Sequence, residues 1–234
     1  MSGNAEMPAY DLSTSALRDL NAKLHALPSN TNETHWTVVN PGGKHALACG
    51  LDKPITVEIG GHVGYYCAGM NELATVIVNG NAGVGVAENM MSGTVHVKGD
   101  ASQAAGATGR GGLLVIDGNA SARCGISMKG IDIVVKGSIG PMSAFMAQSG
   151  NLVVLGDAGE ALGDSIYEAR LFVRGNVASL GTDCTAKEMG PDDRAVLAEV
   201  LARADLAGVS TDDFKLYGSA RRLYHFHVDN VDSY

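Results

Sequence analysis

Apolar and polar positions recur with one fixed period through the middle of the chain. Aliphatic residues come in pairs two positions apart, as Val76 and Val78 do, and a glycine stands two positions after each pair. Seven such glycines follow one another at intervals of 19 residues: Gly61, Gly80, Gly99, Gly118, Gly137, Gly156 and Gly175. Apolar side chains two positions apart share one face of an extended strand. The pattern therefore predicts one short strand in each 19-residue coil, followed by a corner at the glycine.

One such coil cannot bury its apolar face alone. Stacked coils pair each strand with its equivalent in the next turn and enclose a continuous apolar interior. We therefore predict a mainly β protein, a parallel β-helix with one strand per coil and seven coils. The general preference of parallel crossover connections makes it right-handed.

The flanking segments are expected to close the two ends of this solenoid. Residues 12–27 have leucines on one side of an amphipathic helix that Pro28 ends, and a hairpin or irregular strands should follow up to residue 51. A second helix begins at Gly190-Pro191 and is expected as the C-terminal cap. The predicted divisions are an N-terminal helix and cap (1–50), the β-helix (51–184), and a C-terminal helix with an aromatic and basic tail (185–234).

Composition excludes several classes of protein. A net charge of −8 and a pI near 5.3 argue against nucleic-acid binding, which requires a cationic surface. No apolar run approaches the roughly 20 residues of a membrane span, and the N-terminus lacks the apolar core of a secretory signal. The four cysteines are far apart and form no CxxC pair, so we expect reduced thiols in a cytoplasmic protein.

The candidate chemistry is sparse. The stretch AGATGRGG (105–112) resembles a phosphate cradle with Arg110 as its cation, but it is the return segment of the third coil and lacks a Gly-Lys-Ser/Thr ending. His62 and Cys67 are a conceivable base and nucleophile, although Cys124 occupies the same coil position as Cys67, which favours packing.

Two further groups of residues are candidates for chemistry. His225 and His227, with Asp229, are a weak metal motif. Asp100, Asp117 and Asp157 stand at or beside corners without any sign that their carboxylates converge. We therefore identify no catalytic, cofactor-binding or metal-binding residue.

Methionines and aromatic residues gather in the return segments and in the C-terminal tail. For each residue alone, interior packing is the simpler explanation, but as a group they suggest an adaptable partner surface. The tail either docks on a partner or folds back over the last coil. The candidate interface residues are Tyr65, Tyr66, Met90, Met91, Arg110, Met128, Phe145, Met146, Arg221, Arg222, Tyr224 and Phe226.

The coils also carry a family resemblance. Segments such as GHVGYYCAGMN, GNAGVGVAENMMSG and GDAGEALGDSIYEA resemble the GXGXG domain, which is the C-terminal β-helix of the glutamate synthase large subunit. The resemblance extends over nearly the whole sequence, including YDLSTSALRDLNAKLHAL and WTVVNPGGKHALACGL. Within that family it is similar in particular to the separate, glutamate-synthase-like small subunit of N-methylglutamate synthase.

The resemblance implies a scaffold subunit of a split, FMN-dependent enzyme. Partner chains would be an amidotransferase-like subunit and an FMN-binding synthase subunit, with an iron–sulfur cluster as a further candidate on the partners. The complex would convert methylamine and glutamate to N-methylglutamate and ammonia, and this chain would bind no cofactor itself. Alternatives are the β-helix subunit of a glutamate synthase or of a formylmethanofuran-dehydrogenase-like complex, and a stand-alone β-helix acyltransferase. The acyltransferase requires a six-residue repeat, into which 19 does not divide.

Overall fold

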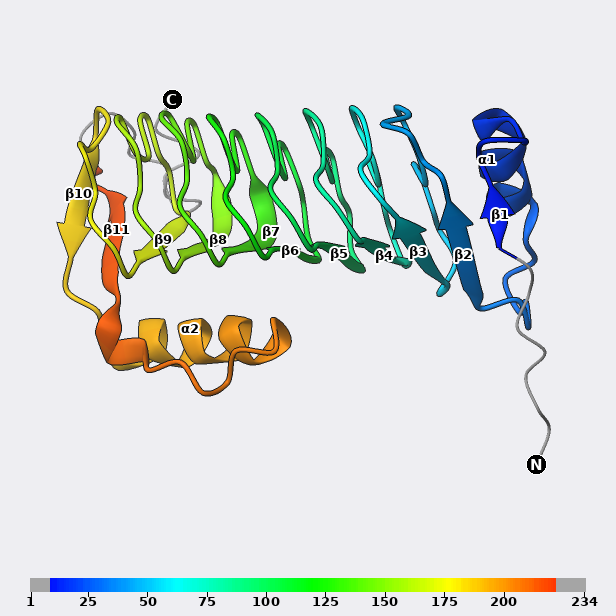
Figure 1. Cartoon of the computed structure of the whole chain (residues 1–234). Coiled ribbons are helices and arrows are strands. Elements are labelled where there is room, and N and C mark those ends of the chain that lie inside the picture. Colours follow the sequence, from blue (N-terminus) through cyan, green and yellow to red (C-terminus); the bar gives the residue numbers. More distant parts are fainter. Residues whose placement is uncertain (1–8, 222–234) are drawn as a thin grey trace, which may run out of the picture.

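A computed structural model, which describes residues 9–221, confirms the parallel β-solenoid of about seven turns with two helices (Figure 1). Its strands stack in chain order into one parallel sheet, and each pairs in register with the equivalent residues of the next coil, as Val76 does with Val95. The parallel strands are β2 (His35–Val39), β3 (Thr56–Gly60), β4 (Thr75–Val78), β5 (Thr94–Val97), β6 (Leu113–Ile116), β7 (Lys129–Val135), β8 (Ser149–Val154) and β9 (Arg170–Val173).

The inward face of this sheet forms the core. Both aliphatic positions that precede each corner glycine are fully buried in all seven coils, for example Val57 and Ile59 in the first coil. Burial of one such side chain stabilises a fold by about 1.5–3 kcal/mol, so the stacked pairs dominate the stability of the solenoid.

The corner glycines are required because the coils approach closely. Six of the seven lack a left-handed backbone, yet a Cβ on Gly80 would lie 2.7 Å from the carbonyl carbon of Gly61. The side chains after the glycines bond from coil to coil: Asn81 Oδ1 accepts the amide of Asp100 (3.0 Å), and Asp100 Oδ1 accepts that of Asn119 (2.7 Å). The same ladder extends from His62 to Asn176.

Each coil closes through a return segment with an unusual backbone. In coils 1 to 6 the residues five, seven and nine positions after the corner glycine all have φ between 52° and 73°. Their amides point alternately to the two neighbouring coils: Ala104 donates to Ala122 O, Gly106 back to Val86 O, and Thr108 forward to Ile126 O. The seventh position is both left-handed and fully enclosed, which explains why the sequence has only alanine or glycine there.

The N-terminal end contains a further coil that the sequence does not reveal. The segment predicted as a hairpin or irregular strands is wrong in its pairing, because β2 runs parallel to β3 with Val38 opposite Ile59. This offset of 21 residues hides it from the 19-residue period. The helix α1 (Leu17–Ala26) and β1 (Tyr10–Asp11) lie beyond it. Asn21 on α1 donates to Ala46 O (2.8 Å) and accepts the Ala48 amide (3.1 Å), so its side chain replaces a preceding coil.

The C-terminal helix lies elsewhere than predicted. Two strands, β10 (Cys184–Lys187) and β11 (Lys215–Ser219), extend the end of the sheet, with β11 antiparallel between β9 and β10. The helix α2 (Pro191–Arg203) instead packs along the outer face of the sheet, followed by a short 3₁₀ turn, η1 (Thr211–Asp213) (Figure 1). The reason is that β6 to β9 carry apolar residues outward as well, namely Leu113, Val115, Val134, Val153 and Phe172.

Candidate functional site: exposed apolar residues on the return segments

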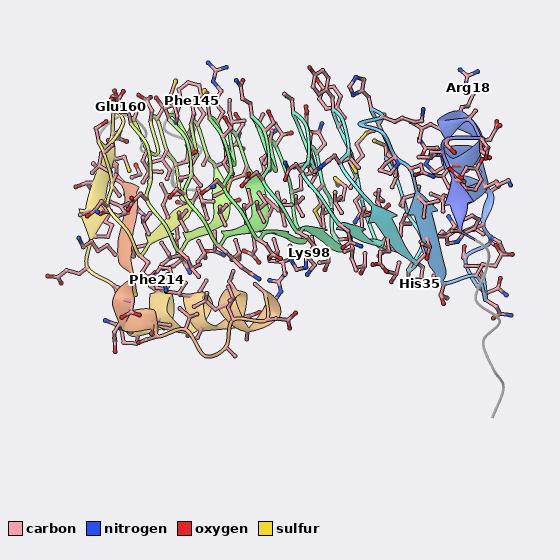
Figure 2. The ribbon with its side chains drawn as sticks, viewed as in Figure 1. Arg18, His35, Lys98, Phe145, Glu160 and Phe214 are labelled. Atoms are coloured by element: carbon pink, nitrogen blue, oxygen red, sulfur yellow. The ribbon has the colours of Figure 1, made fainter. Side chains whose placement is uncertain are left out.

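The return segments form the face of the solenoid opposite the sheet. Phe145 and Glu160 lie on this face, whereas Lys98 and Phe214 lie on the side of the sheet and α2 (Figure 2). Because the backbone alternates in direction, some side chains of each return segment point inward and others point to solvent. Five large apolar side chains of the first two coils are 45–57% exposed, and we refer to them as the N-terminal apolar set: Tyr65, Tyr66, Met70, Leu73 and Met91.

The two tyrosines of this set are held in place by their neighbours. The Tyr65 ring stacks on His45 with centroids 4.4 Å apart, and the Tyr65 amide donates to His45 Nδ1 (2.9 Å). The Tyr66 ring lies over Gly85, where a Cβ would come within 2.7 Å of it. Glycine at position 85 therefore leaves room for the ring. Ordered, half-exposed aromatic rings of this kind lose little side-chain entropy on binding.

The structure divides the predicted interface residues. Met90 and Met128 are fully buried, which corrects their assignment to a partner surface. Both stand ten positions after a corner glycine, where every return segment turns back into the core, and Ile166 occupies the same place.

The other predicted interface residues keep at least part of their surface. Tyr65, Tyr66, Met91, Arg110, Met146 and Arg221 are exposed, and Phe145 is half-buried. Arg222, Tyr224 and Phe226 fall outside the described residues.

Sequence reasoning missed Met70 and Leu73, which are the two most exposed large apolar residues among those described. The signal for Met70 is its place nine positions after the corner glycine, a left-handed position that faces solvent in each coil. Without the backbone geometry, this position could not be separated from the buried one that follows it.

The cysteines are unsuited to nucleophilic chemistry. Burial raises the pKa of all four thiols, to about 12 for Cys124 and about 11 for Cys184. Reactive thiols require the opposite shift. Cys67 is completely buried, and His62, its suggested base, accepts the amide of Asn81 through Nδ1 instead.

The glycine-rich stretch and two of the corner carboxylates have structural partners. The amides of Ala104, Gly106, Thr108 and Arg110 all donate to carbonyls of adjacent coils, so none is directed at a phosphate. Asp100 and Asp157 belong to the corner ladder.

Asp117 belongs to an ion cluster on the outer face of the sheet. It accepts hydrogen bonds from His96 Nε2 (2.8 Å) and Lys136 Nζ (2.7 Å). Partial burial acts to raise the pKa of Asp117, but the bonds from Lys136 and His96 outweigh it and hold the pKa below its ordinary value.

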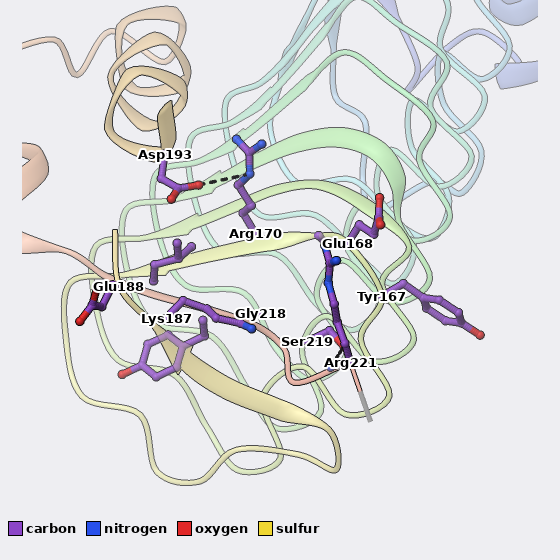
Figure 3. Close-up of a pocket in the computed structure, with 12 residues that line it drawn as sticks. Tyr167, Glu168, Arg170, Lys187, Glu188, Asp193, Gly218, Ser219 and Arg221 are labelled. Carbon is purple, nitrogen blue, oxygen red and sulfur yellow. Dashed lines mark hydrogen bonds and ion pairs between the residues drawn. The ribbon is translucent and has the colours of Figure 1, made fainter. Parts of the chain in front are cut away.

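A polar cleft of about 360 Å³ lies at the C-terminal end of the solenoid (Figure 3). Its charged lining is balanced, with Arg170, Lys187 and Arg221 against Glu168, Glu188 and Asp193, and the Arg170 Nε atom lies 3.5 Å from Asp193 Oδ1. The Ser219 hydroxyl in the cleft donates to Asp183 Oδ2 (3.0 Å), so it lacks the adjacent base of an activated nucleophile.

Comparison with known proteins places the chain in a family. It is 63% identical over 228 residues to Protein GlxC of Rhizobium meliloti (strain 1021), which covers 97% of this chain and 100% of the relative. It belongs to the GlxC family. No family model matches the chain, and no solved structure matches it.

Two further findings describe this GlxC-family chain. Between residues 9 and 221, no three His, Cys, Asp or Glu side chains come together as a metal site, and His225 and His227 lie outside that range. No helix of the same range has the length and apolar character to cross a membrane. The prominent surface feature of this GlxC-family fold is therefore the set of exposed apolar residues on its return face.

Proposed function

We propose that this chain is the non-catalytic scaffold subunit of a split, FMN-dependent glutamate-synthase-like complex, of the N-methylglutamate synthase type. In that complex it holds an amidotransferase-like subunit and an FMN-binding synthase subunit in place. The complex converts methylamine and glutamate to N-methylglutamate and ammonia. FMN, and any iron–sulfur cluster, belong to the partner subunits.

One observation carries this proposal: the groups of the solenoid that could do chemistry are already engaged in holding its coils together. The return-segment amides bond between coils, Asp100 and Asp157 bond along the corners, and Cys67 and Cys124 are core residues. What the fold offers to other molecules is a long, regular surface. The resemblance to the GXGXG β-helix agrees with this architecture, and the relative named Protein GlxC is matched over its full length.

The N-terminal apolar set is the best candidate for a partner contact. Exposed apolar side chains gathered on one face mark interaction sites, and tyrosine and methionine are enriched at interfaces. Met70 is 57% exposed and Tyr66 50% exposed, so burial of both against a partner would remove substantial apolar surface from water.

Co-purification with the two partner subunits tests the proposal. We expect the tagged chain to retain both subunits, and the chain alone to be colourless because FMN stays with the partners. The double variant Tyr66→Ser/Met70→Ser should weaken the assembly about tenfold or more, as loss of interface anchors does. Glu199→Ser, on the exposed side of α2, is the matched control and should leave it unchanged. Recovery of a chain that retains neither subunit would contradict the proposal.

A further inference from the structure

The two ends of the return ladder differ. In each coil the carbonyl six positions after the corner glycine accepts an amide from the next coil; Ser143 O accepts from Gly163, and Leu162 O from Gly181. Leu180 is paired with Leu162 and is therefore the equivalent residue of the last coil. Its carbonyl has no donor within residues 9–221, and its side chain is 37% exposed. The last return segment, residues 178–183, is thus an open edge with an exposed leucine.

The end of the described chain is already pairing with this edge. β11 runs antiparallel to β10 with Ser219 opposite Cys184, and the next residue continues the pairing because Ala220 N donates to Asp183 O (2.8 Å). The Ser219 hydroxyl also bonds to Asp183 Oδ2, and Arg221 has the left-handed backbone (φ 54°) that characterises the return segments. The chain is therefore directed along residues 183 to 178 where its description ends.

We propose that residues 222–225 continue this pairing and cap the open edge in cis. The same antiparallel register, extended one residue at a time, brings Leu223 opposite Leu180 and supplies a backbone donor for its carbonyl. Four residues are enough to pass along the segment, since an extended chain advances about 3.3 Å per residue. Charge agrees, because the edge carries Asp164 and Asp183 while the tail begins with Arg221 and Arg222.

The cap is the counterpart of α1 at the other end. There, Asn21 and His25 bond to backbone atoms of the first coil, as a preceding coil would. An unpaired strand edge invites association with other chains, so a solenoid benefits from closure at both ends. The cap assigns the beginning of the tail to the chain's own last coil and does not depend on the proposed complex.

Hydrogen exchange of the isolated full chain tests the cap. We expect the amides of residues 178–183 to exchange about tenfold or more faster in a chain that ends at Arg221, and in the full-length variant Leu223→Asp, than in the unaltered chain. Val231→Asp, which adds the same charge farther along the tail, is the matched control and should keep the slow exchange.

Two results would overturn the cap. One is equal exchange at residues 178–183 in the full and shortened chains while both retain the same far-ultraviolet circular dichroism. The other is slow exchange that occurs only in a dimeric fraction, which would assign the tail to a neighbouring copy. Slow exchange in a monomer supports the cap in cis.

Discussion

Replacement of a corner glycine by alanine probes the stacking of the coils directly. Gly118 is suitable because its φ lies outside the left-handed region, so alanine is not disfavoured there by backbone conformation. A Cβ at this position would lie 2.3 Å from Asp100 Oδ1 and 2.9 Å from both the carbonyl carbon and the oxygen of Gly99. The first distance is about 1 Å short of an ordinary contact.

The cost of Gly118→Ala follows from these distances. The Asp100 carboxylate can rotate away, but the amide of Asn119 then loses the acceptor that lies 2.7 Å from it. That hydrogen bond contributes about 0.5–1.5 kcal/mol. The backbone of Gly99 cannot rotate away, and the remaining overpacking adds about 1–3 kcal/mol. We therefore expect a loss of about 2–4 kcal/mol in the free energy of unfolding.

Denaturant unfolding followed by circular dichroism measures this loss. Hydrogen exchange of the third and fourth coils should accompany it, because repeat proteins need not unfold in a single step. Gly208→Ala is the control: a Cβ there would meet nothing within 4 Å, and we expect no loss and a gain of at most about 1 kcal/mol. If Gly118→Ala left stability within about 0.5 kcal/mol of the unaltered chain, close approach would not be the reason for the repeated glycine.

Three further predictions concern the N-terminal end, the ion cluster and the thiols. Asn21→Ala should cost about 1–3 kcal/mol and speed hydrogen exchange at residues 46–49, because two backbone groups lose their partner; Asn30→Ala, in the exposed loop after α1, should change neither. Because the pKa of Asp117 is lower in the folded than in the unfolded chain, its carboxylate stabilises the fold above the ordinary pKa of 3.8, and this contribution is lost as the pH falls through the lowered value. Asp117→Asn should therefore flatten the decline of unfolding free energy with pH in that window, and an unchanged acid titration of stability would contradict the cluster. A thiol reagent at pH 8 should leave Cys67 and Cys124 unmodified in the folded chain and modify all four cysteines in denaturant; rapid reaction of Cys67 in the folded chain would show that its burial is incomplete.

The repeat predicted the solenoid because each position in a coil has one environment. Alternate aliphatic residues before a glycine specify an inward-facing strand wherever they recur, and all seven copies do so. The first coil escaped this reasoning because its spacing of 21 residues and its missing corner glycine remove it from the period. The position of α2 is decided by the outer face of β6 to β9, where Leu113 and Phe172 make the sheet apolar on both sides. A strand that is apolar on both faces predicts a covering element, and that signal was present in the sequence.

The candidate surface was predicted only in part. A methionine in a return segment points inward or outward according to its backbone conformation, as the buried Met90 and the exposed Met91 show. Two adjacent residues of one type cannot be assigned to opposite environments from periodicity until the left-handed positions of the return segment are known. The resemblance to the GXGXG family supplied a role and partners, whereas the geometry supplied the side chains that remain available to them.

Reconstitution of the complex with and without this chain tests the central claim most directly. The two partner subunits would be purified separately, and formation of N-methylglutamate from methylamine and glutamate would be measured together with the mass of the assembly. We predict that the chain alone is inactive and that its addition joins the two partners into one particle and raises turnover. Formation of N-methylglutamate by the chain alone, or an assembly of the same mass and turnover without it, would contradict a scaffold role.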